Sequence, residues 1–223
     1  MKRVAIAIDG PSGAGKSTLA KIVAKDMQFV YVDTGALYRT IALFMLRENV
    51  NLDDTAAVIG KLADITIDLR YVDFTQRVFL NEEDVSDLIR TPEVSMAASK
   101  VSAIPEVRAF LLQLQRGMAE KYSVIMDGRD IGTVVLPNAD VKIFLSATAE
   151  ERARRRYDEL ILKDDTIRFE DVLADMIQRD HNDSTRAAAP LKAADDAIML
   201  NTTGNTLEQS VELIKQVIKD AMA

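Results

Sequence analysis

The stretch Gly10-Pro11-Ser12-Gly13-Ala14-Gly15-Lys16-Ser17 decides the fold, because it is a complete G-x-x-x-x-G-K-S loop. An apolar run at residues 4–8 precedes the loop, and apolar residues follow it at helical spacing as far as Met27. Glycines let successive backbone N–H groups turn inward around phosphate oxygens, and the start of the next helix adds its free amides. Lys16 then reaches the β- and γ-phosphates, and the Ser17 hydroxyl holds Mg²⁺. The motif predicts a nucleoside triphosphate site rather than a loop that only turns the chain.

Composition limits the kinds of site that the chain can carry. The 223 residues, 48% of them hydrophobic, suffice for one domain with a sizeable core. The absence of cysteine excludes disulfides and thiolate sites, and the single histidine, His181, argues against a histidine-based metal site or triad. A net charge of -7 disfavours a nonspecific nucleic-acid or membrane surface, so local basic clusters must bind any anionic substrate. No apolar stretch approaches the roughly 20 residues of a membrane span, and we expect a cytosolic protein.

Short apolar runs alternate with helix-period segments along most of the chain. Strands are expected at residues 4–8, 29–32, 123–126, 141–145 and 197–200. Helices are expected at about residues 15–27, 36–48, 54–62, 105–118, 148–162 and 171–180, and from 206 onward. Strands separated by helices imply a mainly parallel sheet covered on both faces, with ligands at the carboxyl ends of the strands.

The apolar period changes to two after Asp64. Alternating runs at residues 65–70 and 76–80 predict a small antiparallel hairpin. We therefore expect a β-containing insert at about residues 63–95.

The end of the second strand carries the segment Asp33-Thr34-Gly35-Ala36-Leu37-Tyr38-Arg39. Asp33 or Thr34 either caps the following helix or belongs to a ligand site. Arg39, one turn inside that helix, suits bidentate capture of a second phosphate group. The arginine therefore favours the ligand site.

The turn Asp127-Gly128-Arg129-Asp130-Ile131-Gly132 packs two carboxylates, an arginine and two glycines behind another strand. A plain charged turn does not need glycine at both places. Asp127 is expected to hold Mg²⁺ through water, and Arg129 to bind a phosphate group.

Arginines concentrate between residues 150 and 186. They are Arg152, Arg154, Arg155, Arg156, Arg168, Arg179 and Arg186. For Arg152 and Arg154 we expect a solvated helix face paired with nearby acids. For Asp180 a solvated loop acid and a site residue are equally open, so it is not singled out for the site.

A mobile lid is the expected role of Arg155, Arg156 and the segment 179–186. Phosphoryl transfer depends on alignment and on cations placed where negative charge moves, and a closing lid also excludes water. Asp183 is included in this site because it lies between Arg179 and Arg186.

Four segments together resemble the bacterial cytidylate kinase family over nearly the whole chain. They are the opening stretch 8–17, the turns 33–39 and 127–133, and the trio Arg179, Asp183 and Arg186. The resemblance implies an α/β, P-loop three-layer fold with a central mainly parallel sheet, a small β-containing monophosphate-binding insert and an Arg-rich lid. It implies a single domain with its core at residues 1–62, 96–150 and 190–223, the insert at about 63–95 and the lid at about 151–189.

The resemblance also implies roles for individual residues. The cytosine edge would be read by Ser99, Arg108 and Asp130, the acceptor phosphate would be held by Arg39 and Arg129, and the pentose would meet Arg179 and Asp183. Thr34 stands where the family often has Ser, and it keeps the hydroxyl. The catalytic cations would be Lys16, Arg129, Arg155, Arg156 and Arg186. ATP would contact Gly10, Ser12, Gly13, Ala14, Gly15, Lys16, Ser17 and Thr18, with Mg²⁺ held through Ser17.

The implied reaction is transfer of the γ-phosphoryl group of ATP to CMP or dCMP. We expect a cytoplasmic monomer, the simplest state for a two-substrate enzyme that closes a lid. Its expected partners are small nucleotides, not nucleic acid or membranes. Another acceptor on the same scaffold, such as UMP, AMP or shikimate, is an alternative. A GTPase-type switch predicts an Asn-Lys-x-Asp run, which the sequence lacks. A module that docks a partner on the β insert predicts no ADP formation with any monophosphate.

Overall fold

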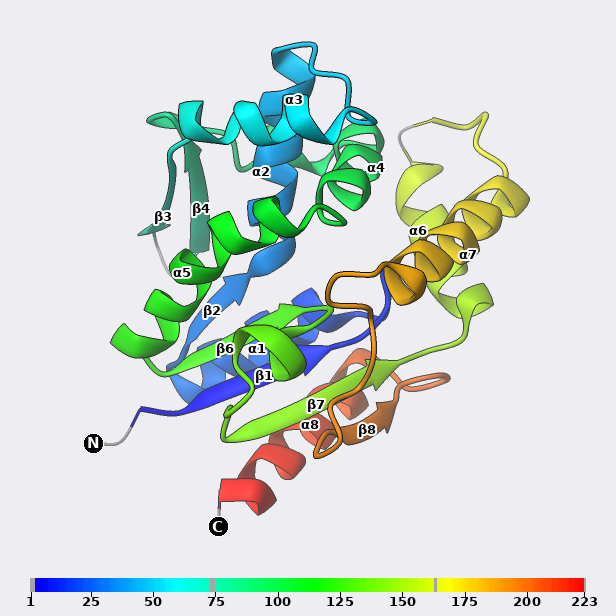
Figure 1. Ribbon diagram of the computed structural model, residues 1–223. Coiled ribbons are helices and arrows are strands. Elements are labelled where there is room, and N and C mark those ends of the chain that lie inside the picture. The colour runs from blue at the N-terminus through cyan, green and yellow to red at the C-terminus, as the bar shows by residue number, and fades with distance from the viewer. Residues whose placement is uncertain (1–2, 73–74, 163, 223) are drawn as a thin grey trace.

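A five-stranded parallel sheet forms the centre of the computed structural model, which describes residues 3–72, 75–162 and 164–222 (Figure 1). The strands lie in the order β2-β6-β1-β7-β8. Their bounds are Ala5–Asp9 for β1, Val30–Asp33 for β2, Val124–Gly128 for β6, Val141–Ser146 for β7 and Ile198–Asn201 for β8. All four neighbouring pairs are parallel, so the predicted parallel sheet is confirmed.

Alternate residues of these strands pack against helices on opposite faces of the sheet. Ile6 and Ile8 of β1 share a core cluster with helices α1 (Lys16–Met27) and α8 (Leu207–Met222). Ala7, between them, faces a second cluster that includes Met118 of α5 (Pro105–Lys121). Strands that are buried on both faces consist of nearly continuous apolar residues, which explains why short apolar runs located them in the sequence.

The predicted hairpin is also confirmed, as a small antiparallel sheet of order β3-β4-β5. Its strands are Ile67–Val72, Thr75–Leu80 and Glu83–Asp84. Helices α2 (Thr34–Arg47), α3 (Thr55–Gly60) and α4 (Pro92–Val101) lie to one side of it in the upper part of Figure 1. One apolar cluster contains buried residues of this sheet, α2, α4 and α5. This apolar cluster includes residues before and after the predicted insert in the sequence. The boundaries of the insert at about 63–95 therefore remain a prediction.

Two helices, α6 (Ala149–Leu160) and α7 (Phe169–Thr185), form a separate pair at the carboxyl edge of the sheet (Figure 1). They pack through a small cluster around Ala153, Val172 and Met176. The helix predicted at residues 171–180 extends to residue 185, so Asp183 lies on a helix and Arg186 is its C-cap. The short helical segments η1 (Leu62–Asp64), η2 (Leu88–Arg90) and η3 (Ile131–Val135), like α4, are elements that periodicity did not predict. No helix in the described part of the chain is long and apolar enough to cross a membrane.

Candidate active site

The carboxyl ends of the parallel strands open into a pocket of about 670 Å³. Residues from the glycine loop, α2, α4, the turn after β6, α6 and α7 line it. Ten lining residues are cationic: Lys16, Arg39, Arg90, Arg108, Arg129, Arg152, Arg155, Arg156, Arg179 and Arg186. Six are acidic: Asp33, Asp127, Asp130, Glu159, Asp175 and Asp183. A chain with a net charge of -7 thus has a pocket with an excess of positive charge.

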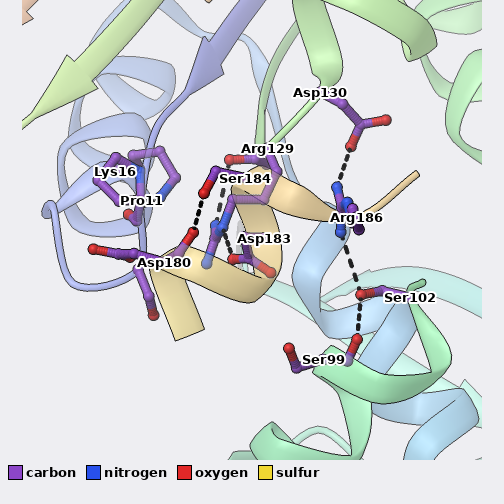
Figure 2. A network of polar contacts seen from close by, with 12 residues as sticks. Pro11, Lys16, Ser99, Ser102, Arg129, Asp130, Asp180, Asp183, Ser184 and Arg186 are labelled. Carbon is purple, nitrogen blue, oxygen red and sulfur yellow. Dashed lines mark hydrogen bonds and ion pairs between the residues drawn. The ribbon is translucent and has the colours of Figure 1, made fainter. Parts of the chain in front are cut away.

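The glycine loop has the backbone that a phosphate cradle requires. Gly10, Gly13 and Gly15 have φ angles of 149°, 75° and 85°, which favour glycine. A Cβ atom on Gly10 would lie 2.0 Å from the carbonyl oxygen of Leu145. The Lys16 Nζ donates to the Pro11 carbonyl at 2.7 Å (Figure 2). Burial, and then the positive charge of Arg129, lower the pKa of Lys16 to about 7, and an anion bound beside it would stabilise the charged ammonium form.

The hydroxyl expected to hold Mg²⁺ lies beside a carboxylate. Ser17 Oγ donates to Asp127 Oδ2 at 2.8 Å, and the Tyr31 hydroxyl donates to Oδ1 at 2.7 Å. Burial and the nearby charge of Asp33 raise the pKa of Asp127, and a bound cation would relieve this penalty. Within the described ranges no group of three or more His, Cys, Asp or Glu side chains could hold a metal ion alone. One hydroxyl and one carboxylate beside a phosphate loop fit Mg²⁺, which usually takes its other ligands from water and substrate phosphates.

The turn after β6 is held by the end of β1 and the start of α2. Asp9, the last residue of β1, accepts from the backbone N–H groups of Ile131 and Gly132 at 2.8 and 2.7 Å. Thr34 Oγ1 donates to the Asp127 carbonyl at 2.7 Å. A Cβ on Gly128 would come within 2.7 Å of the Thr34 hydroxyl, so this close approach requires glycine. The turn that carries Arg129 and Asp130 is therefore fixed by the end of β1 and the start of α2.

Asp33 caps α2 and also holds the pocket arginine of that helix. Its carboxylate accepts from the Ala36 N–H at 2.9 Å and from Arg39 Nη2 at 3.0 Å. Although burial acts to raise it, the pKa of Asp33 is lowered, chiefly by the Arg39 charge. Arg39 Nε is buried and has no hydrogen-bond partner. Asp33 thus both caps α2 and forms an ion pair with Arg39.

A carboxylate with two guanidinium groups lies at the far end of the pocket. Asp130 is 4% exposed and forms an ion pair with Arg108 Nη2, and Arg186 Nη2 lies 3.6 Å from its other oxygen. The Arg108 guanidinium also lies over the Tyr38 ring, 5.4 Å from its centroid. Ser99, on α4, lines the same end, and its carbonyl accepts from Ser102 (Figure 2). This end offers both a carboxylate acceptor and guanidinium donors.

Between the two ends, α7 brings an arginine and a carboxylate against Arg129. Asp183 Oδ2 accepts from Arg129 Nε at 2.8 Å (Figure 2). Arg179 has a buried Nε with no hydrogen-bond partner. Burial, followed by the charge of Arg129, lowers the pKa of Arg179 to about 10, which still leaves it a cation at neutral pH. Two cations thus lie close together in the pocket.

The comparisons with known proteins agree with this geometry. The family model described as cytidylate kinase matches residues 6–220. The chain belongs to the cytidylate kinase family. Proteins named cytidylate kinase from Carboxydothermus hydrogenoformans and Caldanaerobacter subterraneus subsp. tengcongensis are 49% and 50% identical to it. The alignments cover 96% and 97% of this chain and 96% and 95% of those proteins.

A solved structure has a similar fold. An uncharacterized protein from Eubacterium ventriosum ATCC 27560 gives a TM-score of 0.56 over 97% of this chain and 99% of its own, at 12% sequence identity. At this identity the likeness concerns the fold alone. The resemblance to cytidylate kinases seen in the four sequence segments is confirmed by the family assignment.

The structure brings nearly all predicted site residues into one pocket. Gly10 and Ala14 do not line it, and they shape the glycine loop instead. Arg155 and Arg156 line it while paired with Glu151 and Glu159 on their own helix. Their catalytic role in this family member remains a prediction.

Arg152 was predicted wrongly as part of a solvated face. It is 4% exposed, and its guanidinium donates to the Ser12 carbonyl at 2.8 Å and to Asp180. Asp180 is therefore an ion-pair partner and not a solvated loop acid. Arg154 is exposed as expected, with its guanidinium over the Phe169 ring. Helical spacing in the sequence places Arg152 and Arg155 near each other on α6. It does not show which face of the helix packs against the glycine loop.

Proposed function

We propose that this protein transfers the γ-phosphoryl group of ATP, bound with Mg²⁺, to CMP or dCMP, giving ADP and CDP or dCDP. One observation carries the proposal: a single pocket has a phosphate loop at one end and the Asp130 carboxylate with its guanidinium partners at the other. Membership of the cytidylate kinase family supports the choice of acceptor. We further propose that the protein acts as a monomer in the cytoplasm.

At the donor end, the proposed ligands of the triphosphate are the loop amides and the ammonium group of Lys16. The Lys16 Nζ now bonds the Pro11 carbonyl, and it would exchange this bond for phosphate oxygens. Ser17 and Asp127 would hold Mg²⁺. When bound, the ion neutralises charge on the phosphate oxygens.

At the acceptor end, unsatisfied donors favour an anion. The Nε atoms of Arg39 and Arg179 are buried without hydrogen bonds, and a buried donor left unpaired costs about 1–3 kcal/mol. An acceptor phosphate would satisfy them. Arg129, whose Nε already bonds Asp183, has further nitrogens for the same phosphate.

The base is proposed from the donor and acceptor pattern around Asp130. Cytosine has an exocyclic amino group, which suits a carboxylate, beside ring acceptors, which suit the guanidinium of Arg108. Uracil inverts two of these positions. A mismatched buried group would cost about 1–3 kcal/mol, enough for roughly tenfold to hundredfold discrimination.

The chemical step needs no general base. The attacking atom is an oxygen of the acceptor phosphate, which is already anionic at neutral pH. The protein contributes alignment and positive charge where negative charge moves. Arg155 and Arg156 of α6 and Arg179 of α7 line the pocket, and we propose that they supply part of this charge.

The decisive experiment is a coupled assay of ADP release with CMP, dCMP, UMP, AMP and shikimate. We expect fast release with CMP or dCMP, and at least about tenfold lower kcat/KM with UMP. Lys16→Met should reduce turnover by orders of magnitude without altering the circular dichroism spectrum. Equal rates with UMP would contradict the base assignment. Fast ADP release with no acceptor would instead support a hydrolytic switch.

A further inference from the structure

Two residues outside the proposed ligand contacts, Ser102 and Ala189, hold the side chain of Arg186 in place. The Arg186 side chain is 7% exposed and lies at the end of α7, beside Asp130 (Figure 2). Nε donates to the Ala189 carbonyl at 2.8 Å, and Nη1 donates to Ser102 Oγ at 3.3 Å. Two of its three nitrogens are therefore occupied by the protein.

The bond to Ala189 depends on an unusual backbone conformation. Ala189 has a φ of 49°, in the left-handed region that residues other than glycine rarely adopt. It also precedes Pro190, which further restricts its backbone. This conformation turns its carbonyl toward Arg186. Backbone strain of this kind persists where the surrounding structure requires it, and it is frequent at functional sites.

The bond to Ser102 is directional as well. The Ser102 hydroxyl donates its hydrogen to the Ser99 carbonyl at 2.9 Å, so a lone pair remains to accept from Arg186 (Figure 2). The Ser102 backbone carbonyl accepts from Arg108 Nη1 at 3.2 Å. Ser102, which is 7% exposed, thus contacts both guanidinium groups that flank Asp130.

These contacts leave one nitrogen of Arg186 without a hydrogen bond, in an ion pair with Asp130. Nη2 is buried, makes no hydrogen bond, and lies 3.6 Å from Asp130 Oδ1, beyond hydrogen-bond distance. A guanidinium held through its other two nitrogens loses little further freedom when an acceptor oxygen reaches the third.

We infer that Ser102 and Ala189 are positioning residues that preorganise Arg186 for the acceptor nucleotide. The inference rests on the proposed function, because it takes the ligand of Nη2 to be an oxygen of that nucleotide. Neither residue need touch the nucleotide. Their effect should therefore appear in acceptor binding and not in ATP binding.

The first test is Ser102→Ala, which removes the hydroxyl and leaves the backbone bond to Arg108. We expect KM for CMP, and Kd for CMP alone by calorimetry, to rise by about tenfold, the effect of one lost hydrogen bond to a charged group. We expect kcat and KM for ATP to change by less than about twofold. Ser102→Thr, which restores the hydroxyl, should recover most of the affinity.

Ser210→Ala is the matched control. Ser210 is also buried, at 4% exposure, and its hydroxyl also donates to a backbone carbonyl, that of Thr206, but it lies on α8. Its loss should lower the melting temperature about as much as Ser102→Ala and leave CMP affinity unchanged. Equal loss of CMP affinity in Ser102→Ala and Ser102→Thr, or none in either, would overturn the role of the hydroxyl.

A second pair of variants tests Ala189. Ala189→Gly permits the same left-handed backbone without a Cβ and should keep CMP affinity within about twofold. Ala189→Pro fixes φ near −65°, turns the carbonyl away from Arg186, and should weaken CMP binding by about tenfold. Unchanged binding in Ala189→Pro would overturn the inference. Wild-type ADP release with CMP is measured first, so failure of the proposed function would appear there, while the calorimetric Kd values still decide the inference.

Discussion

Asp9 connects the glycine loop to the turn after β6. It immediately precedes the glycine loop, and its two oxygens accept from consecutive amides of the segment that follows Asp130. Burial raises its pKa from 3.8 to about 6, despite the opposing effect of the two amide bonds. Of the charged neighbours, Asp130 raises this pKa and Lys16 lowers it. The Asp9 carboxylate that holds the turn after β6 is therefore destabilised in its charged form by burial.

This carboxylate predicts a pH dependence of stability. Because its folded pKa of about 6 exceeds the usual 3.8, folding takes up a proton between these values. The free energy of unfolding should fall as pH rises through this window, by roughly 3 kcal/mol in total at about 1.4 kcal/mol per pH unit. Asp9→Asn should remove this component. Urea unfolding of both proteins between about pH 4.5 and 7.5 measures the difference.

The matched control is Glu106→Gln, at an exposed position in the first turn of α5. It removes an acidic charge without a buried carboxyl, so its stability should follow the wild type across the same pH range. A constant difference between wild type and Asp9→Asn at every pH would contradict a raised pKa of Asp9.

At this scale the sequence predicted residues that belong to motifs and missed those defined by contacts. The glycine loop and the turn 127–132 were found because a local spacing determines their chemistry. Ser102 and Asp9 were not found, because each acts through atoms far away in the chain: Ser102 through Arg186, and Asp9 through Ile131. No local pattern in the sequence carries that information.

Among the elements, the helix pair α6 and α7 is joined to the glycine loop through the buried side chain of Arg152. Arg152 of α6 donates to the Ser12 carbonyl at 2.8 Å and to the Ala147 carbonyl at 3.0 Å, and it pairs with Asp180 of α7. A Cβ on Gly13 would lie 3.2 Å from the Arg152 Cβ, so loop and helix are in close contact. The position of the helix pair and the shape of the loop are thus coupled.

Arg152→Met tests this coupling. The variant leaves the carbonyl of Ser12 without its donor, and we expect KM for ATP to rise by about tenfold, corresponding to about 1.4 kcal/mol. In a cycle with Asp180→Asn, the two effects should be non-additive by about 1–3 kcal/mol, because the residues share one ion pair. ATP titrations of the four proteins give the coupling energy.

Arg154→Met is the control on the same helix. Arg154 is exposed, and its guanidinium stacks on Phe169 rather than on the loop. Its KM for ATP should stay at the wild-type value. Additive effects of Arg152→Met and Asp180→Asn would show that the ion pair does not connect the helices to the loop.

The sequence predicted the helices and strands better than the contacts between them. Alternation gave the β3–β4 hairpin, yet not the contacts by which it holds the edge strand β2. In the structure Gln76 Oε1 accepts from the Asp33 N–H at 3.0 Å, and the Tyr71 hydroxyl donates to the Tyr31 carbonyl at 2.9 Å. These bonds satisfy polar backbone groups at the sheet edge. The period of apolar residues in a strand shows which face of the strand is apolar. It does not show which groups form hydrogen bonds with the edge of the strand.

On the scale of the whole molecule, the net charge and the pocket charge have opposite signs. The chain carries 28 Lys and Arg against 35 Asp and Glu, whereas the pocket lining carries ten cationic side chains against six acidic ones. Composition predicted that anions would need local basic clusters, and the structure shows these clusters gathered from distant segments. Solvent screens charges beyond about 10 Å at 0.1 M salt, so an incoming nucleotide should respond mainly to the pocket.

The two charges predict opposite effects of salt. If the pocket dominates, kcat/KM for CMP at saturating ATP should fall by roughly three- to tenfold between about 0.05 and 0.5 M NaCl. If the net charge of -7 dominates, screening would reduce repulsion and kcat/KM would rise. Initial rates of ADP release across this series decide between them.

Two arginine variants locate the effect within the molecule. Arg90 lines the pocket with its side chain 55% exposed, 4.0 Å from Asp33, so Arg90→Gln should reduce the dependence on salt. Arg77 lies on β4, where it pairs with Asp84 and Asp87, and Arg77→Gln removes the same charge away from the pocket lining. Its salt dependence should match that of the wild type. An equal reduction in both variants would mean that the total charge of the molecule, and not the field of the pocket, attracts the substrate.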